Sequence, residues 1–178
     1  MSKISFTKVR NVKTPTRAYE YAAGIDFYVP EFSYEFVKDV KEKNPNWCES
    51  FIVSWHPKLD GVSFILEPGG RINIPSGIKV NIEDKNTCLL AANKSGVASK
   101  KGLNHLAELI DPDYQGEIHI NLYNSGSTPV EISSGEKIIQ FMQLPIIRDN
   151  WVEVTNDEFD AIPESERNTG GFGSSGNT

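Results

Sequence analysis

The sequence predicts an all-β barrel or sandwich, and three observations carry this prediction. Between about residues 61 and 154, short runs rich in β-forming residues alternate with turn residues. In the runs at 78–82 and 118–122, apolar and polar residues alternate, which is typical of strands with one buried face. Patterns typical of helices are scarce over the same stretch.

The expected strands follow one another at short intervals. Gly, Pro, Ser and Asn mark turns at 67–70, 75–77, 124–126 and 133–136. The runs predicted as strands are 62–66, 71–74, 77–82, 87–92, 117–123, 129–132, 137–144 and 151–154.

Residues 31–60 depart from this alternation of short strands and turns and indicate an insertion made of a helix and a strand. Ser33 is a favourable N-cap, and the apolar residues at 34, 37 and 40 recur at helical spacing. The Asn-Pro-Asn sequence at 44–46 would end this helix, after which residues 51, 53 and 55 alternate as in a strand. We expect the insertion to be peripheral to the chemistry and to offer a contact surface for a protein partner.

The chain has 178 residues, which fits one domain. We predict a single β domain over residues 1–166, insertion included, followed by a flexible C-terminal lid at 167–178. The lid is rich in Gly, Ser, Asn and Thr, with Phe172 as its only apolar side chain, so alone it buries too little to stay ordered.

Composition and charge exclude several classes of protein. With 18 Lys and Arg against 24 Asp and Glu, the formal net charge is −6, which argues against broad electrostatic binding of nucleic acid. No apolar run approaches the roughly 20 residues that span a bilayer, and no signal-peptide pattern is found. We expect a cytoplasmic protein with no membrane partner. Cys48 and Cys88 are too few for a disulfide scaffold, and we expect both to be reduced, buried thiols.

Residues 109–117 place Asp111, Asp113 and Tyr114 on a tight connection before an alternating run. A β-turn alone explains the Asp111-Pro112 pair, because such turns favour Asp at the first position and Pro at the second. Alternatively, one carboxylate acts as a general base and Tyr114 forms a flat wall against a ligand ring. The residues alone leave both interpretations open.

Residues 93–102 hold three lysines and two serines where a strand gives way to a short helix. Ammonium, hydroxyl and free backbone N–H groups together suit a phosphate. The alternative is a solvated, lysine-bearing turn, because the spacing of a P-loop is absent.

The C-terminal segment sets Arg167 and Phe172 among glycines and serines, which permit close approach of the backbone. One interpretation is a disordered tail. The other is a lid that orders on a ligand, with Arg167 on phosphate, Phe172 on a ring, and the following N–H and hydroxyl groups of Gly173 and Ser174 as donors.

In this order, the segments resemble the five motifs of the homotrimeric dUTP diphosphatase (dUTPase) family. The segments that resemble the motifs are 23–27, 94–98, 110–116, 135–141, and Arg167 with 170–176. The resemblance covers most of the chain apart from 31–60, and the third and fifth motifs are the specific ones.

The resemblance implies a jelly-roll-like β fold, a homotrimer whose subunits share each active site, Mg²⁺ as cofactor, and hydrolysis of dUTP to dUMP and pyrophosphate. By carry-over, Asp111 is the base that activates water and Tyr114 packs on the deoxyribose. Mg²⁺ would be held mainly by the triphosphate and water, with no direct protein ligand. The other substrate-binding residues that the resemblance implies are Lys94, Ser95, Gly96, Ala107, Gln140, Arg167, Phe172, Gly173 and Ser174.

Two positions depart from the family's pattern. Lys94 stands where the family usually has arginine, which keeps the charge but loses the bidentate fork. Ala107 stands in the expected hairpin before Asp111, where the family commonly has glycine and reads uracil with backbone groups.

Two other functions therefore stay open. One is a related enzyme of the same fold, such as a dCTP deaminase or a diphosphatase with another base preference. The other is a non-enzymatic, nucleotide-sensing regulatory protein.

Overall fold

The computed structural model describes residues 3–45, 51–56 and 61–170 of the chain. Cys48, Phe172, Gly173 and Ser174, which the sequence singled out, lie outside the described residues. The chain separates into two compact units, Met1–Ile146 and Ile147–Thr178.

Within the described residues, the first unit arranges antiparallel strands in three sheets. The first sheet has the order β1 (Ile4–Lys8), β5 (Arg71–Ile82), β9 (Glu117–Asn124), β7 (Leu103–His105). The second has the order β2 (Ile25–Tyr28), β11 (Lys137–Pro145), β6 (Thr87–Asn93), β8 (Leu109–Ile110). The third has the order β10 (Val130–Ser133), β4 (Gly61–Leu66), β3 (Phe51–His56). The predicted all-β, jelly-roll-like fold class is confirmed.

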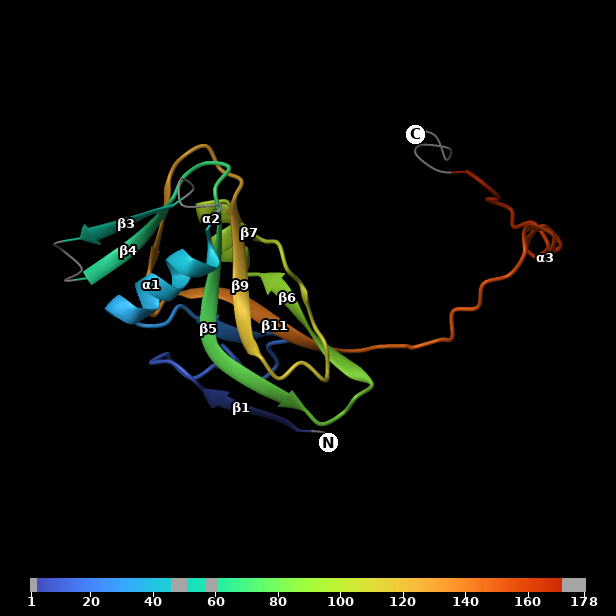
Figure 1. The fold of residues 1–178 in the computed structure, drawn as a ribbon, viewed down its shortest axis with the longest axis horizontal. Coiled ribbons are helices and arrows are strands. Elements are labelled where there is room, and N and C mark those ends of the chain that lie inside the picture. The colour runs from blue at the N-terminus through green and yellow to red at the C-terminus, as the bar shows by residue number, and fades with distance from the viewer. Residues whose placement is uncertain (1–2, 46–50, 57–60, 171–178) are drawn as a thin grey trace. The chain divides into compact units, whose positions relative to one another are not determined.

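The alternating runs supply the core. Figure 1 shows the long strand β5 beside β9, and these two strands pair along most of their length. Every second residue of β9 is buried, with Ile118, Ile120 and Leu122 inside, as the alternation predicted. Removing one such side chain from water contributes about 1.5–3 kcal/mol, so these strands form the stable frame of the unit.

The turn predictions are confirmed at three of the four places and wrong at one. At 124–126, where β9 ends, the Asn124 side-chain oxygen accepts from the Gly126 N–H at 2.9 Å, which closes an Asx-turn. Residues 67–70 and 133–136 close through backbone hydrogen bonds of 2.8 and 3.3 Å, with a glycine at positive φ in each. At 75–77, however, β5 continues through a bulge instead of turning. Gly77 takes the positive φ of 76° at the bulge, and its N–H donates to the Glu117 carboxylate at 2.7 Å, which satisfies the backbone without a reversal.

The insertion contains the predicted helix, α1 (Tyr34–Lys43). The Ser33 hydroxyl accepts from the Phe36 N–H at 3.1 Å, and Asn44 is the C-cap. In Figure 1, α1 lies against β5. Phe36 and Val40 are buried in the core, so α1 is part of the framework of the unit. That the insertion is peripheral to the chemistry stays a prediction.

Asn44 fastens the end of α1 to β5. Its side-chain oxygen accepts from the Asn73 N–H at 2.8 Å, and its amide donates to the Asn73 carbonyl at 2.9 Å. A side chain therefore makes the two bonds that a neighbouring strand would otherwise make there.

The second unit contains one short helix in its described part, α3 (Asn156–Asp160), which the sequence did not predict. Thr155 and Glu158 cap it reciprocally. The strand predicted at 151–154 is absent from the single chain, and Trp151 is 100% exposed. An extended segment becomes a strand only where a neighbour pairs its backbone, and the described chain offers it none. The division predicted after residue 166 stays a prediction.

Among the described residues, no helix has both the length and the apolar character to cross a bilayer. Cys88 is a buried free thiol, as predicted.

Candidate active site

A hollow of about 370 Å³ opens at the start of α2 (Ser95–Lys101), the short helix predicted after β6. Four predicted site residues, Lys94, Ser95, Gly96 and Gln140, lie together in its wall. The other residues that line it are Val97, Lys100, Lys101 and Glu136. Because Ser95 and Gly96 begin the helix, their backbone N–H groups have no helical acceptor.

Lys94 is held by a buried carboxylate. Asp26 on β2 is only 2% exposed, and its side chain forms ion pairs with Lys94 and, at 3.4 Å, with Lys137 on β11. One carboxylate thus anchors two ammonium groups beside the hollow and leaves one positive charge in excess. Through this contact a buried residue outside the hollow supports an anion site.

Gln140 is fixed by the close approach of Gly24. The side-chain amide of Gln140 donates to the Asn93 carbonyl at 3.0 Å, which joins β11 to the end of β6. A Cβ at Gly24 would lie 2.5 Å from the Gln140 side-chain oxygen. Glycine is therefore required there for Gln140 to keep its place.

The charge around the hollow favours an anion. Lys94, Lys100 and Lys101 line it, against the single carboxylate of Glu136, which pairs with Lys101 at 2.5 Å. Lys100, Lys101 and Glu136 were not among the predicted site residues, although the lysines stood out in the 93–102 segment. Several ammonium groups beside hydroxyl, amide and free N–H donors form a site suited to phosphate oxygens.

Asp111 lies on the tight turn that the sequence predicted. The Tyr114 N–H donates to the Asp111 carbonyl at 3.1 Å, and Pro112 is buried. Lys85 donates to the Pro112 carbonyl at 2.7 Å and to the Ile82 carbonyl at 2.8 Å, which secures the turn to the end of β5. Asp111 is exposed, so it is presented to solvent on a rigid support.

Tyr114 forms a half-exposed wall beside this turn. Its hydroxyl donates to the Glu117 carbonyl at 2.8 Å, and 44% of the residue is exposed. A Cβ at Gly116 would lie 2.3 Å from the Tyr114 hydroxyl oxygen, so glycine lets the ring lie close against the backbone. The exposed part of the ring offers a flat apolar face to a ligand.

The structure does not bring Asp111 to the hollow within one chain. Ile110 on β8 pairs with Leu89 on β6, which places Asp111 level with Cys88. Lys94 follows six residues after Cys88, and at about 3.3 Å per residue the two site regions lie about 20 Å apart along β6. A single chain therefore holds apart the two regions that the resemblance assigns to one site, the hollow and the Asp111 turn, and we call these regions half-sites.

The expectation that Ala107 lies in a hairpin is wrong. The strand before it, β7, pairs with β9, whereas the strand after it, β8, pairs with β6, so residues 106–108 cross between two sheets. Ala107 is exposed in this crossing. The Glu108 carbonyl accepts from the Ala91 N–H at 2.7 Å, which holds the crossing against β6 between the two half-sites.

Arg167 lies in the second unit, on an exposed turn. Its guanidinium donates to the Gly170 carbonyl at 2.8 Å. The predicted lid residues Phe172, Gly173 and Ser174 lie outside the described part of the chain.

The donor groups fit Mg²⁺ only as a companion of the phosphates. Among the described residues, no three His, Cys, Asp or Glu side chains gather to hold a metal ion. The carboxylates nearest the hollow, Asp26 and Glu136, are committed to lysines. Mg²⁺ readily keeps waters and phosphate oxygens as its ligands, so this arrangement suits an ion that arrives with a triphosphate.

An antiparallel β fold with lysine, hydroxyl and free N–H donors around one hollow suits the binding of phosphorylated small molecules. The sequence model of the dUTPase family matches residues 62–176, and the chain belongs to this family.

Curated relatives support the same assignment. A deoxyuridine 5'-triphosphate nucleotidohydrolase of Pseudomonas putida (strain W619) is 40% identical over 114 residues, which cover 63% of this chain and 72% of the relative. One of the same name from Ectopseudomonas mendocina (strain ymp) is 39% identical over the same shares.

Solved structures show the fold beyond the matched segment. The dUTPase of Staphylococcus bacteriophage 80alpha, solved with dUPNHPP, is 22% identical, with a TM-score of 0.70 and 98% of each chain covered. A mutant dUTPase from phage phi11 of S. aureus, described with a structural Mg(II) ion, has a TM-score of 0.63 at 19% identity, and the match covers 85% of this chain and 96% of the phage chain.

Proposed function

We propose that this protein hydrolyses dUTP to dUMP and pyrophosphate. The observation that carries the proposal is the cationic hollow lined by Lys94, Ser95, Gly96 and Gln140, in a chain of the dUTPase family. The curated relatives that carry the name deoxyuridine 5'-triphosphate nucleotidohydrolase support dUTP as the substrate.

The triphosphate would bind in the hollow. Lys94, Ser95, Gly96 and Gln140 line the hollow. The triphosphate oxygens would accept from the Lys94 ammonium, the hydroxyl and N–H of Ser95, the N–H of Gly96 and the Gln140 amide. Bound Mg²⁺ would neutralise charge that develops on the phosphates. Together these protein donors would orient the chain of phosphates so that the α-phosphorus is open to attack.

Asp111 would act as the general base. Its carboxylate takes a proton from a water molecule while the water oxygen bonds to the α-phosphorus. The bond from the α-phosphorus to the bridging oxygen breaks, and that oxygen leaves with the pyrophosphate. Tyr114 would pack its open face on the deoxyribose, and backbone groups near Ala107 would read the uracil.

The tail would close the site as a lid. We assign Arg167 to the far phosphates, Phe172 to the uracil ring, and Gly173 and Ser174 to further donors. Closure of this kind excludes water and completes the reactive geometry, so it affects the rate more than binding.

The active form would be a homotrimer with shared sites. About 20 Å separates Asp111 from Lys94 in one chain, so a complete site needs Asp111 of one subunit and the hollow of another. Large apolar side chains of the second unit also lie exposed in the single chain, which supports docking on a neighbour. These residues are Ile147, Trp151, Val152, Val154, Phe159 and Ile162. Light scattering should give a trimer mass, and a fully active monomer at micromolar protein would refute the assembly.

A substrate panel tests the activity. The purified protein is incubated with each deoxynucleoside triphosphate and Mg²⁺, and pyrophosphate and ammonia are measured. We expect pyrophosphate from dUTP alone. Ammonia from dCTP would indicate a deaminase, pyrophosphate from another nucleotide would indicate a different base preference, and tight dUTP binding without turnover would indicate a sensor. A nucleotide enzyme of this kind would work in the cytoplasm, where its substrate is found.

Asp111→Asn tests the mechanism, with Asp113→Asn as the matched control. Both residues are exposed and lie on the same turn, so neither change should move stability by more than about 0.5 kcal/mol. Loss of a general base should lower the rate by about 10² to 10⁴ for Asp111→Asn only. Equal turnover by Asp111→Asn and the parent would refute this role even if dUTP is the substrate.

A further inference from the structure

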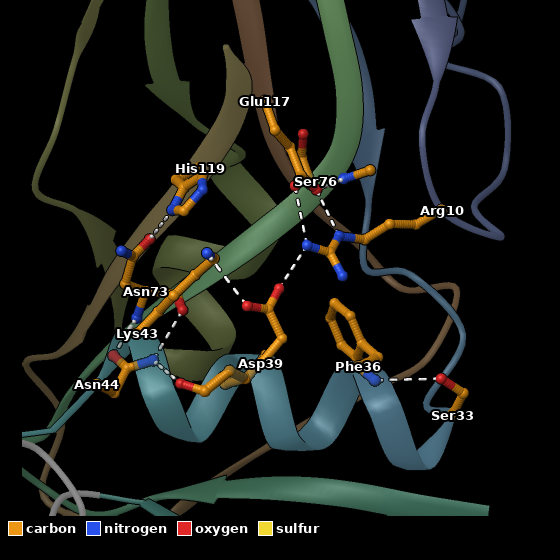
Figure 2. Close-up of polar contacts among 12 residues, drawn as sticks. Arg10, Ser33, Phe36, Asp39, Lys43, Asn44, Asn73, Ser76, Glu117 and His119 are labelled. Carbon is orange, nitrogen blue, oxygen red and sulfur yellow. Dashed lines mark hydrogen bonds and ion pairs between the residues drawn. The ribbon is translucent and has the colours of Figure 1, made fainter.

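Arg10 joins the insertion helix to the strand that follows the Asp111 turn. Its Nε donates to Glu117 Oε1 at 2.6 Å, and its Nη2 donates to Glu117 Oε2 at 2.9 Å. The same Nη2 donates to Asp39 of α1. Figure 2 shows the guanidinium between the two carboxylates, one on the helix and one on β9. All three side chains are largely sheltered from solvent, where such charge-assisted bonds are stronger than on an open surface.

Glu117 is the anchor of the Asp111 turn. Its carboxylate accepts from the Gly77 N–H at 2.7 Å and so is fixed to the bulge of β5 as well as to Arg10. Its backbone carbonyl accepts from the Tyr114 hydroxyl at 2.8 Å. The position of Glu117 therefore sets where the Tyr114 ring and the end of the turn lie.

The helix side of this connection is also rigid. Asp39 pairs with Lys43 one turn later at 3.1 Å, and the Phe36 ring centroid lies 5.5 Å from the Arg10 guanidinium carbon. Burial raises the pKa of Asp39, but the hydrogen bond from Lys43 and the charges of Arg10 and Lys43 outweigh it and hold the pKa below its usual value. The hydrogen bond to Glu117 is the main cause of the raised pKa of Arg10. Arg10 and Asp39 thus stay ionised and paired at neutral pH.

We propose that Arg10 and Asp39 are positioning residues for catalysis: through Glu117, they let the insertion helix set the placement of the Asp111–Tyr114 turn. This inference rests on the proposed function of Asp111, and it opposes the expectation from the sequence that the insertion is peripheral to the chemistry. Neither residue lines the phosphate-binding hollow, so they should affect turnover more than the binding of the phosphates. A displacement of about 1 Å at a reacting group can cost up to about 100-fold in rate, which makes such a support measurable.

Asp39→Ala tests the connection, with Glu42→Ala as the matched control. Glu42 lies on the same helix in an exposed pair with Lys38 at 3.7 Å, away from the contacts that Asp39 makes. Alanine favours the helix at both positions. We expect kcat to fall about tenfold in Asp39→Ala and to stay within twofold of the parent in Glu42→Ala. The dissociation constant of a non-hydrolysable dUTP analogue should change less than about threefold in both.

A second readout does not depend on activity. Amide hydrogen exchange of residues 111–117 should quicken in Asp39→Ala and stay at the parent rate in Glu42→Ala. Parent-like exchange together with parent-like kcat in Asp39→Ala would refute the inference. A parent chain that hydrolyses no deoxynucleotide would refute the proposed function alone, and the exchange comparison would still decide whether α1 holds the turn.

A double variant tests whether Asp39 acts through Arg10. In that case Arg10→Gln with Asp39→Ala should have the kcat of Arg10→Gln alone. Arg10→Lys should recover part of the rate, because one ammonium keeps the charge but cannot hold both carboxylates as the planar fork does. Losses that multiply in the double variant would overturn the proposed route.

Discussion

Phe36→Ala should destabilise the whole first unit, because the insertion helix belongs to its core. Phe36 is 3% exposed, and its ring centroid lies 5.7 Å from that of Phe32 and 6.4 Å from that of Phe64. Removing a buried phenylalanine typically costs about 3–5 kcal/mol. The site cannot collapse easily, because Asn44 holds the end of α1 on β5, so we expect the upper part of this range.

The assay is urea unfolding monitored by circular dichroism. The protein concentration is kept fixed, since assembly adds to apparent stability. For a chain of this size, the expected loss corresponds to a fall in melting temperature of about 6–20 °C. Tyr34→Ala is the control, because Tyr34 is an aromatic residue of the same helix that is 80% exposed, and it should change stability by about 0.5 kcal/mol or less. A loss under about 1 kcal/mol in Phe36→Ala would mean that α1 packs independently of the β core.

Three further outcomes are expected. Truncation after Glu166 should leave the melting temperature and assembly mass unchanged and should lower kcat more than about tenfold. Unchanged kinetics would mean that the tail is a linker with no role in turnover. Gly24→Ala should displace the Gln140 side chain, which the new Cβ would approach to 2.5 Å. Loss of one hydrogen bond of about 1 kcal/mol from Gln140 to a phosphate oxygen should weaken analogue binding about fivefold by calorimetry, and equal affinity would contradict the close fit. Burial lowers the pKa of His119 from 6.5, so the folded state binds its proton less readily than the unfolded state does, and stability should fall as the pH drops below about 6.5 through the folded-state pKa. Urea midpoints across this pH range should show the fall in the parent and less of it in His119→Gln; identical profiles would argue against burial as the cause.

Much of the frame follows from local patterns. The alternation at 118–122, the capped helix after Ser33 and the glycine turns were predicted because period, capping and positive φ are properties of neighbouring residues. That Lys94, Ser95 and Gly96 share one hollow follows from a similar cause, since these residues are consecutive at the start of α2.

The sequence-based predictions fail where contacts between residues far apart in the chain determine the local structure. The bulge at 75–77 has the composition of a turn, and contacts with distant residues make it continue as a strand: the Gly77 N–H donates to the Glu117 carboxylate, and the Gly77 carbonyl accepts from the Val9 N–H. The helix was correctly predicted, but its buried face was only partly so: Val40 is buried as expected, whereas Tyr34 is 80% exposed and Phe36 is buried in its place. The fit of Phe36 against Phe64 depends on the third sheet, which the helix sequence does not indicate. Nothing in the spacing of Asp26 and Lys94 indicates their ion pair.

The separation of Asp111 from Lys94 along β6 also has a consequence for mutant chains that are expressed together. With each proposed site assembled from two chains, a chain defective at Asp111 and another defective at Lys94 would each be inactive alone. Co-expressed, they would form mixed trimers in which an intact Asp111 faces an intact hollow at some sites. Two damaged copies of the gene could thus complement each other, whereas two copies damaged in the same half-site could not.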